Sequence, residues 1–184
     1  MKTMSAKSCD RRRLAVGGFT LTEMLVVLVI VASLAAIAVP VFRSGRDSAN
    51  RAGCLSNLRQ IGMALETYTQ DHGRMMPVME AGRRSRNEEV PVMDTVLIDY
   101  VGSGEVFRCP ADPEQWEKSG SSYLWNPLLN GRPRTRLSFF GTDEPGRIPM
   151  VTDKEAWHPG ANEGTNFLYA DLSAANEVRF APSP

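Results

Sequence analysis

Histidine and recognisable catalytic patterns are scarce in this chain of 184 residues. Its only histidines are His72 and His158, and none of the G-x-S-x-G, H-E-x-x-H or phosphate-loop patterns occurs. A catalytic nucleophile and base cannot be paired from these residues, so we expect no enzyme. Internal repeats and low-complexity tracts are also absent, which argues against a repeat architecture.

An excess of positive charge is missing as well. The chain has 21 basic and 21 acidic residues, and five of the basic residues but only one acid lie in residues 1–18. The remainder therefore has 16 basic and 20 acidic residues, a net charge of −4. A nucleic-acid-binding surface is basic, so we expect no nucleic-acid partner.

One long apolar run stands out. From Phe19 to Phe42 the only charged residue is Glu23, and this run of 24 residues follows a basic leader. A helix of that length spans roughly 36 Å at about 1.5 Å per residue, enough to cross a bilayer. Basic residues before a span favour the cytoplasmic side, so we expect the leader there and the C-terminal part outside the cytoplasm. The lone carboxylate calls for a partner, because an ionised group within a span costs on the order of 3 kcal/mol.

The segment from Gly18 to Glu23, GFTLTE, followed by an apolar run, resembles the class III signal of type IV pilins and type II secretion pseudopilins. The resemblance implies that a prepilin peptidase cuts between Gly18 and Phe19 and methylates the new amine of Phe19. It also implies that Glu23 pairs with a neighbouring subunit's amine, and that Pro40 kinks the helix. Small residues allow close helix packing, and the run contains Ala32, Ser33, Ala35, Ala36 and Ala38.

This resemblance implies a pseudopilin of the bacterial inner membrane. Such a subunit joins other pseudopilins in a pilus-like filament of a type II secretion system and meets its assembly platform. One alternative is a type IV pilus subunit for adhesion or DNA uptake. Another is a secreted or anchored domain that binds carbohydrate or another ligand, because Ala36-Ile37-Ala38 also resembles an A-x-A secretory cleavage site.

The patterning after the apolar run predicts an α+β, pilin-like fold. Apolar residues at helical spacing between Leu55 and Tyr68 extend the helix from about Phe19 to about His72, where Gly73 and Pro77 end it. Residues 92–101 are expected to form a short helix. The expected strands of a small antiparallel sheet are 105–109, 123–126, 137–140, 148–152, 166–170 and 177–180, the last two as a hairpin. The expected organisation is a removed leader, 1–18, an assembly helix, 19–42, and a globular domain, 43–184.

Two cysteines, Cys54 and Cys109, remain beyond the leader. Disulfides persist outside the cytoplasm, and a bridge would join the long helix to the globular part. The alternative is that each packs as a small buried thiol.

The closing segment holds the candidate ligands of a metal, and we expect no other cofactor. Major pseudopilins carry a calcium site in their C-terminal region, and Asp153, His158 and Asp171 are the corresponding candidates by resemblance. Calcium needs about six to eight oxygens, so a solvated acidic loop with Asp171 shaping a hairpin turn is the alternative. Trp157 and Tyr169 are either a sugar-binding face or packing residues.

Overall fold

The computed structural model describes residues 19–158 and 164–179. Its longest element is helix α1, Leu21–Asp71, which is continuous through Pro40. The chain divides into two compact units, Met1–Phe42 and Arg43–Pro184. The long helix expected from the apolar run and the stripe that follows it is therefore confirmed.

Helix α1 ends where the sequence predicts. Gly73 and Arg74 both have positive φ, 62° and 63°, and the Arg74 amide donates to the Thr69 carbonyl at 2.6 Å. The His72 ring lies against the same end of the helix, with Nδ1 2.8 Å from the carbonyl oxygen of Tyr68. A left-handed glycine after the last turn is a common helix stop.

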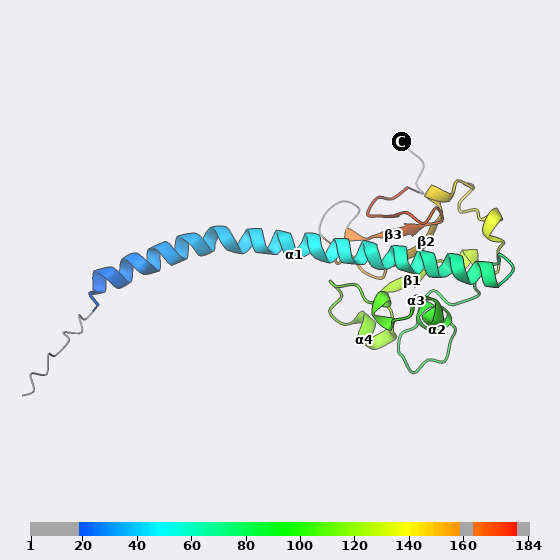
Figure 1. The fold of residues 1–184 in the computed structure, drawn as a ribbon, viewed down its shortest axis with the longest axis horizontal. Coiled ribbons are helices and arrows are strands. Elements are labelled where there is room, and N and C mark those ends of the chain that lie inside the picture. The colour runs from blue at the N-terminus through cyan, green and yellow to red at the C-terminus, as the bar shows by residue number, and fades with distance from the viewer. Residues whose placement is uncertain (1–18, 159–163, 180–184) are drawn as a thin grey trace, which may run out of the picture. The chain divides into compact units, whose positions relative to one another are not determined.

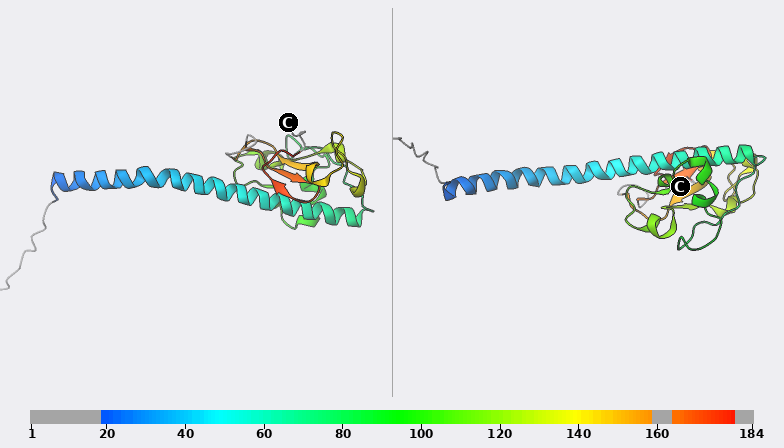
Figure 2. Two further views of the ribbon diagram at one scale, coloured as in Figure 1. Left: turned by 90° about the horizontal axis from the view of Figure 1, so that it is seen from above. Right: turned by 60° about the horizontal axis from the view of Figure 1, so that its bottom comes forward.

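The second unit contains a four-stranded antiparallel sheet in the order β1-β2-β3-β4. Its strands are β1, Tyr123–Trp125; β2, Pro149–Asp153; β3, Phe167–Tyr169; and β4, Ala174–Ala175. Within this unit the sheet and the short helices lie beside the part of α1 that follows Arg43 (Figures 1 and 2). The contact is close, because a Cβ added at Gly62 of α1 would lie 3.1 Å from Leu168 of β3.

The hydrophobic core joins α1, the sheet and the intervening loops. Its fully buried members include Leu58 and Ile61 from α1, Phe107, Trp125 from β1 and Leu168 from β3. The expected helix at 92–101 is two short helices, α2, Met93–Val96, and α3, Ile98–Val101. A further short helix is α4, Gln115–Ser119. The α+β class expected from the sequence is confirmed.

The predictions of strands at residues 105–109 and 137–140 are wrong. Residues 104–107 form the 3₁₀ helix η1, Gly104–Phe107, and the adjacent Val106 and Phe107 are both buried, which is incompatible with the alternation of a strand. Residues 137–140 lead into a tight turn instead. Phe140 and Gly141 have φ of 45° and 83°, and the backbone N–H groups of Phe139 and Thr142 each donate to the other residue's carbonyl. Other 3₁₀ turns are Pro127–Leu129, Arg134–Arg136 and Pro145–Arg147.

The expected closing hairpin is present, but the prediction of its second strand at residues 177–180 is wrong. β3 pairs with Ala174–Ala175 and not with residues from Glu177 onward. The reason is a tight turn: Leu172 has φ 68°, and the Tyr169 amide donates to the Ser173 carbonyl at 2.9 Å. Phe180, the end of the expected strand, lies outside the described residues.

Candidate functional site

The start of α1 is a capping box built by Thr20 and Glu23. The backbone N–H and the hydroxyl of Thr20 each donate to Oε2 of Glu23 at 2.8 Å. In return, the Glu23 amide donates to Oγ1 of Thr20 at 3.2 Å. This reciprocal pair satisfies amides that the first turn of a helix leaves without partners. The Thr-x-x-Glu spacing is the sequence signal that predicts the cap.

The apolar part of α1 is uncovered within the described chain. Its large side chains are exposed from Leu21 to Phe42, with Phe42 77% exposed. The helix is long and apolar enough to cross a membrane. Ser33 donates its hydroxyl to the carbonyl of Ile30 at 2.8 Å, so its polar group is satisfied within the helix. Of the two residues at the expected peptidase cleavage site, Phe19 is exposed and Gly18 lies outside the described residues.

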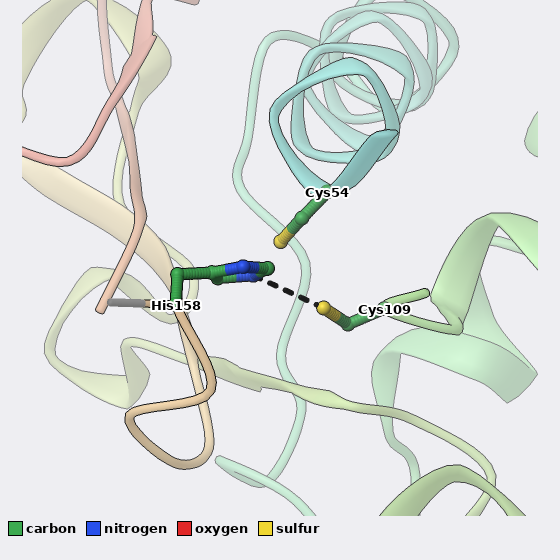
Figure 3. Close-up of side chains that lie close together, drawn as sticks. All are labelled: Cys54, Cys109 and His158. Carbon is green, nitrogen blue, oxygen red and sulfur yellow. Dashed lines mark hydrogen bonds between the residues drawn. The ribbon is translucent and has the colours of Figure 1, made fainter. Parts of the chain in front are cut away.

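A second site lies inside the globular unit, where the two cysteines meet His158. The sulfurs of Cys54 and Cys109 and a ring nitrogen of His158 all lie within 4.8 Å of one another. Both thiols point toward the imidazole of His158 (Figure 3), and the sulfur of Cys109 is 3.2 Å from Nε2. Both cysteines are completely buried, and His158 is 2% exposed. Both are free thiols, so of the two alternatives left by the sequence this structure has the buried thiols and not the disulfide.

The turn that begins at Cys109 brings its sulfur to α1. The Asp112 amide donates to the Cys109 carbonyl at 3.0 Å, which closes a turn over residues 109–112. The Cys109 amide donates to Oγ of Ser122 at 2.9 Å. From α1, the side-chain amide of Asn57 donates to the carbonyl of Arg108 at 2.7 Å. Gly53 leaves room for this turn, because a Cβ there would lie 2.9 Å from the ring of Pro110.

Asp153, at the end of β2, borders the cluster. Its Oδ1 accepts from the Cys54 thiol at 3.0 Å, and its Oδ2 lies 3.7 Å from Nε2 of His158. Asn166 holds Oδ2 in place with its backbone N–H at 2.8 Å and its side-chain amide at 2.9 Å. The carboxylate is 3% exposed, so four chemically reactive side chains share one buried space.

The protonation of this cluster is strongly perturbed. The hydrogen bond from Cys54, followed by the contact with His158, lowers the pKa of Cys109 to about 5 against the opposing effect of burial. The same hydrogen bond and burial raise the pKa of Cys54. Burial raises the pKa of Asp153 to about 6. A low-pKa thiol is a nucleophile only where a substrate can reach it, and complete burial of Cys109 denies that access.

The three metal candidates from the sequence separate into two places. Asp153 and His158 lie together, but with sulfur neighbours that the sequence did not associate with them. Asp171 shapes the β3–β4 turn as expected: its Oδ1 accepts from the Ser173 backbone N–H at 2.9 Å and from its hydroxyl at 2.6 Å. Among the described residues, the ligand group therefore contains Cys54, Cys109 and His158 and does not contain Asp171. Sulfur and nitrogen donors do not suit calcium, which binds oxygen.

The aromatic residues considered for sugar binding are packing residues. Tyr169 is completely buried, and its hydroxyl donates to the carbonyl of Glu177 at 2.5 Å. Trp157 is half-buried and packs against the core. These two side chains do not form the exposed aromatic platform that sugar binding requires.

The chain is similar to known proteins at its N-terminus and over most of its length. Residues 13–39 match the family model "Prokaryotic N-terminal methylation motif". Over 141 residues the chain is 30% identical to type II secretion system core protein G of Pectobacterium carotovorum subsp. carotovorum, covering 77% of this chain and 84% of that one. The chain belongs to the type II secretion system core protein G family. The core protein G of Klebsiella michiganensis is 33% identical over 142 residues, covering 77% of this chain and 92% of that one.

A shorter match is to a protein with a different name. Competence protein ComGC of Halalkalibacterium halodurans is 31% identical over 67 residues, 36% of this chain and 66% of that one. No solved structure matches the chain. Membership of the core protein G family makes the chain a pseudopilin, with an apolar N-terminal helix suited to membrane anchoring.

Proposed function

We propose that this pseudopilin is a structural subunit of a pilus-like filament in a type II secretion system, with no catalytic role of its own. Prepilin peptidase removes residues 1–18 and methylates Phe19. Before assembly, the chain crosses the inner membrane once, with the leader in the cytoplasm and residues 43–184 outside. The assembly platform then draws the helix into the filament with other pseudopilin subunits.

The observation that carries this proposal is the uncovered apolar half of α1. Nothing in the described part of the chain covers its side chains between Leu21 and Phe42. An isolated apolar surface of this kind is stable only against lipid or against other apolar helices. A filament supplies the second environment, and Ala32, Ala35 and Ala36 permit the close approach of neighbouring helices.

The carboxylate of Glu23 fixes how neighbouring helices are aligned along the filament. Cleavage before Phe19 creates a cationic amine near the carboxylate of Glu23, within an otherwise apolar surface. A neighbouring subunit's carboxylate neutralises that amine, and two unpaired charges become one pair. The capping box supports this role, because Thr20 already holds the Glu23 side chain at the end of the helix.

A cross-linking experiment tests the proposal. Ala35→Cys introduces a thiol on the apolar half of α1 in cells that contain the prepilin peptidase and the other secretion subunits. We expect oxidation to give disulfide-linked dimers, because each subunit contributes one accessible thiol, and the dimers to disappear when peptidase is absent. Monomers alone in fully processing cells would contradict a helix-packed filament.

The match to ComGC favours a second candidate, a subunit of a competence pilus that takes up DNA. Complementation separates the two. The chain should restore protein secretion in a strain that lacks core protein G, and should leave DNA uptake unrestored in a strain that lacks ComGC. The reverse pattern would assign the chain to the competence machinery.

A further inference from the structure

The buried cluster has the composition and spacing of a metal site. Its three closest donors are the sulfurs of Cys54 and Cys109 and the imidazole of His158, all within 4.8 Å of one another. They come from α1, from the turn before α4 and from the loop after β2, segments far apart in sequence. Figure 3 shows the three side chains directed toward a common point between them.

We propose that Cys54, Cys109 and His158 bind Zn²⁺, and that the carboxylate of Asp153 completes a tetrahedral site. Zinc in structural sites takes four ligands of this kind, thiolates and imidazoles above all. The proposal concerns the globular unit and is independent of filament assembly.

The distances fit a tetrahedral ion. With bonds of about 2.3 Å to sulfur and 2.0 Å to nitrogen, tetrahedral zinc separates a sulfur ligand from a nitrogen ligand by about 3.5 Å. The sulfur of Cys109 is 3.2 Å from Nε2 of His158. Oδ2 of Asp153 is 3.7 Å from the same nitrogen, and Oδ1 is 3.0 Å from the sulfur of Cys54. The other pairs among the two sulfurs and the imidazole lie within 4.8 Å of one another, so binding one ion requires donor separations to close by up to about 1 Å.

Two thiols and a carboxylate face one another inside the cluster. The Cys54 thiol donates to Oδ1 of Asp153 at 3.0 Å, and the two sulfurs lie within 4.8 Å of each other. Nε2 of His158 faces these groups, whereas Nδ1 is buried and has no hydrogen-bond partner among the described residues. A divalent cation satisfies two thiolates and a carboxylate at once, and its binding releases the thiol protons to solvent.

A second layer of residues already orients the ligands. Asn166 donates twice to Oδ2 of Asp153, which leaves Oδ1 turned toward Cys54. Ser122 fixes the backbone of Cys109. Such outer partners are a regular part of zinc sites, and their loss costs roughly 10- to 100-fold in metal affinity.

The bound ion would hold α1 to two loops. Cys54 lies on α1, while Cys109 and His158 lie on segments with little regular structure of their own. The free energy of metal binding at such a site stabilises the folded state, because the unfolded chain does not assemble the ligands. Zinc would therefore join the helix to the globular part, as a disulfide between Cys54 and Cys109 would have done.

The test uses the full chain in detergent micelles, in a Cys9→Ser background so that only the two buried thiols remain. We expect metal analysis to find about one zinc ion per chain after dialysis. Cobalt in its place should give sulfur-to-metal charge-transfer absorption and the intense visible bands of a tetrahedral centre. Chelation should lower the melting midpoint, and zinc but not calcium should restore it, by about 5 °C or more.

Variants locate the ion. Cys109→Ser and His158→Ala should each lose bound zinc, and Asn166→Ala should keep it with an affinity lowered about 10- to 100-fold. Asp171→Ala is the matched control, since this acid lies in the same C-terminal segment but outside the cluster, and it should bind zinc as the parent does. A variant with a substitution in the core can misfold. The zinc content and cobalt spectrum of the parent protein therefore test the proposal without any variant.

Three results with the parent protein would each overturn the proposal. One is a folded chain that retains no zinc and gives no tetrahedral cobalt spectrum with its thiols reduced. Another is a Cys54–Cys109 disulfide, seen as two thiols missing from labelling of the unfolded, unreduced chain isolated from cells. A midpoint raised by calcium and unaffected by zinc would likewise refute the ligand set.

Discussion

The hydroxyl of Ser122 donates to Oδ2 of Asp112 at 2.5 Å, and this bond sets the position of Cys109. The same hydroxyl oxygen accepts the Cys109 amide at 2.9 Å. Asp112 also accepts three backbone N–H groups, those of Glu114, Gln115 and Trp116. One buried carboxylate thus organises the turn that presents a cysteine to α1.

Removal of this carboxylate should destabilise the globular unit. Asp112→Ala leaves several donors without an acceptor, and we expect the free energy of unfolding to fall by about 2 to 4 kcal/mol. Denaturation followed by tryptophan fluorescence measures it, because Trp116 lies on α4. Asp99→Ala, at an exposed acid, is the control and should change the free energy by less than about 0.5 kcal/mol. Equal effects of the two variants would contradict the role given to Asp112.

The ion pair between Arg83 and Asp94 predicts a pH-dependent loss of stability. Both side chains are mostly buried, and burial raises the pKa of Asp94 although Arg83 opposes the shift. Arg83→Met leaves the carboxylate without its cation, so we expect a loss of about 3 kcal/mol near neutral pH.

The sign of the pH effect follows from the raised pKa. The folded state holds the Asp94 proton more tightly than the unfolded state, so this group's contribution to stability is present at low pH and declines as pH rises through the folded pKa. The loss of stability in Arg83→Met should therefore shrink as pH falls, because protonation of Asp94 removes the unpaired charge. Melting midpoints between about pH 4 and pH 8 measure it. A deficit that stays constant with pH would mean that Arg83 acts through packing alone.

Two substitutions at Glu23 distinguish the role of its charge in assembly from its role in capping α1. Glu23→Gln keeps a side chain that can complete the capping box with Thr20 but removes the charge, whereas Glu23→Val removes both. If the carboxylate neutralises a neighbour's amine, both variants should insert and be cleaved normally, and both should fail to form filaments. Sheared-filament yield and membrane fractionation measure this. Normal filaments from Glu23→Gln would show that capping, not charge, is what assembly requires.

Processing can be read from the intact mass of the mature chain. We expect the loss of residues 1–18 and the gain of one methyl group on Phe19. Gly18→Ala should be cut partially, whereas Gly18→Arg should block cutting, because the extended backbone before the cut tolerates only a small residue. A mature chain that begins at Val39 would instead support an ordinary secretory signal.

Local pattern in the sequence is enough to predict the long helix and where it stops. The apolar run from Phe19, the lone Glu23 and the apolar stripe between Leu55 and Tyr68 are readable because helix periodicity and hydropathy are local properties. The same holds for the stop at Gly73 and for the strands around Trp125 and Val151. Family membership rests on this segment together with the similarity over most of the chain.

Which side chains meet depends on the tertiary structure. Residues 105–109 and 137–140 have the composition of strands, but the serine cap of η1 at Ser103 and a turn at Phe140 give them other conformations. Cys54, Cys109, Asp153 and His158 are spread over about a hundred residues, and no spacing rule relates them. They converge because α1 packs on the sheet while the turn at Asp112 folds back onto Gly53, and such long-range contacts depend on how the whole core fills space.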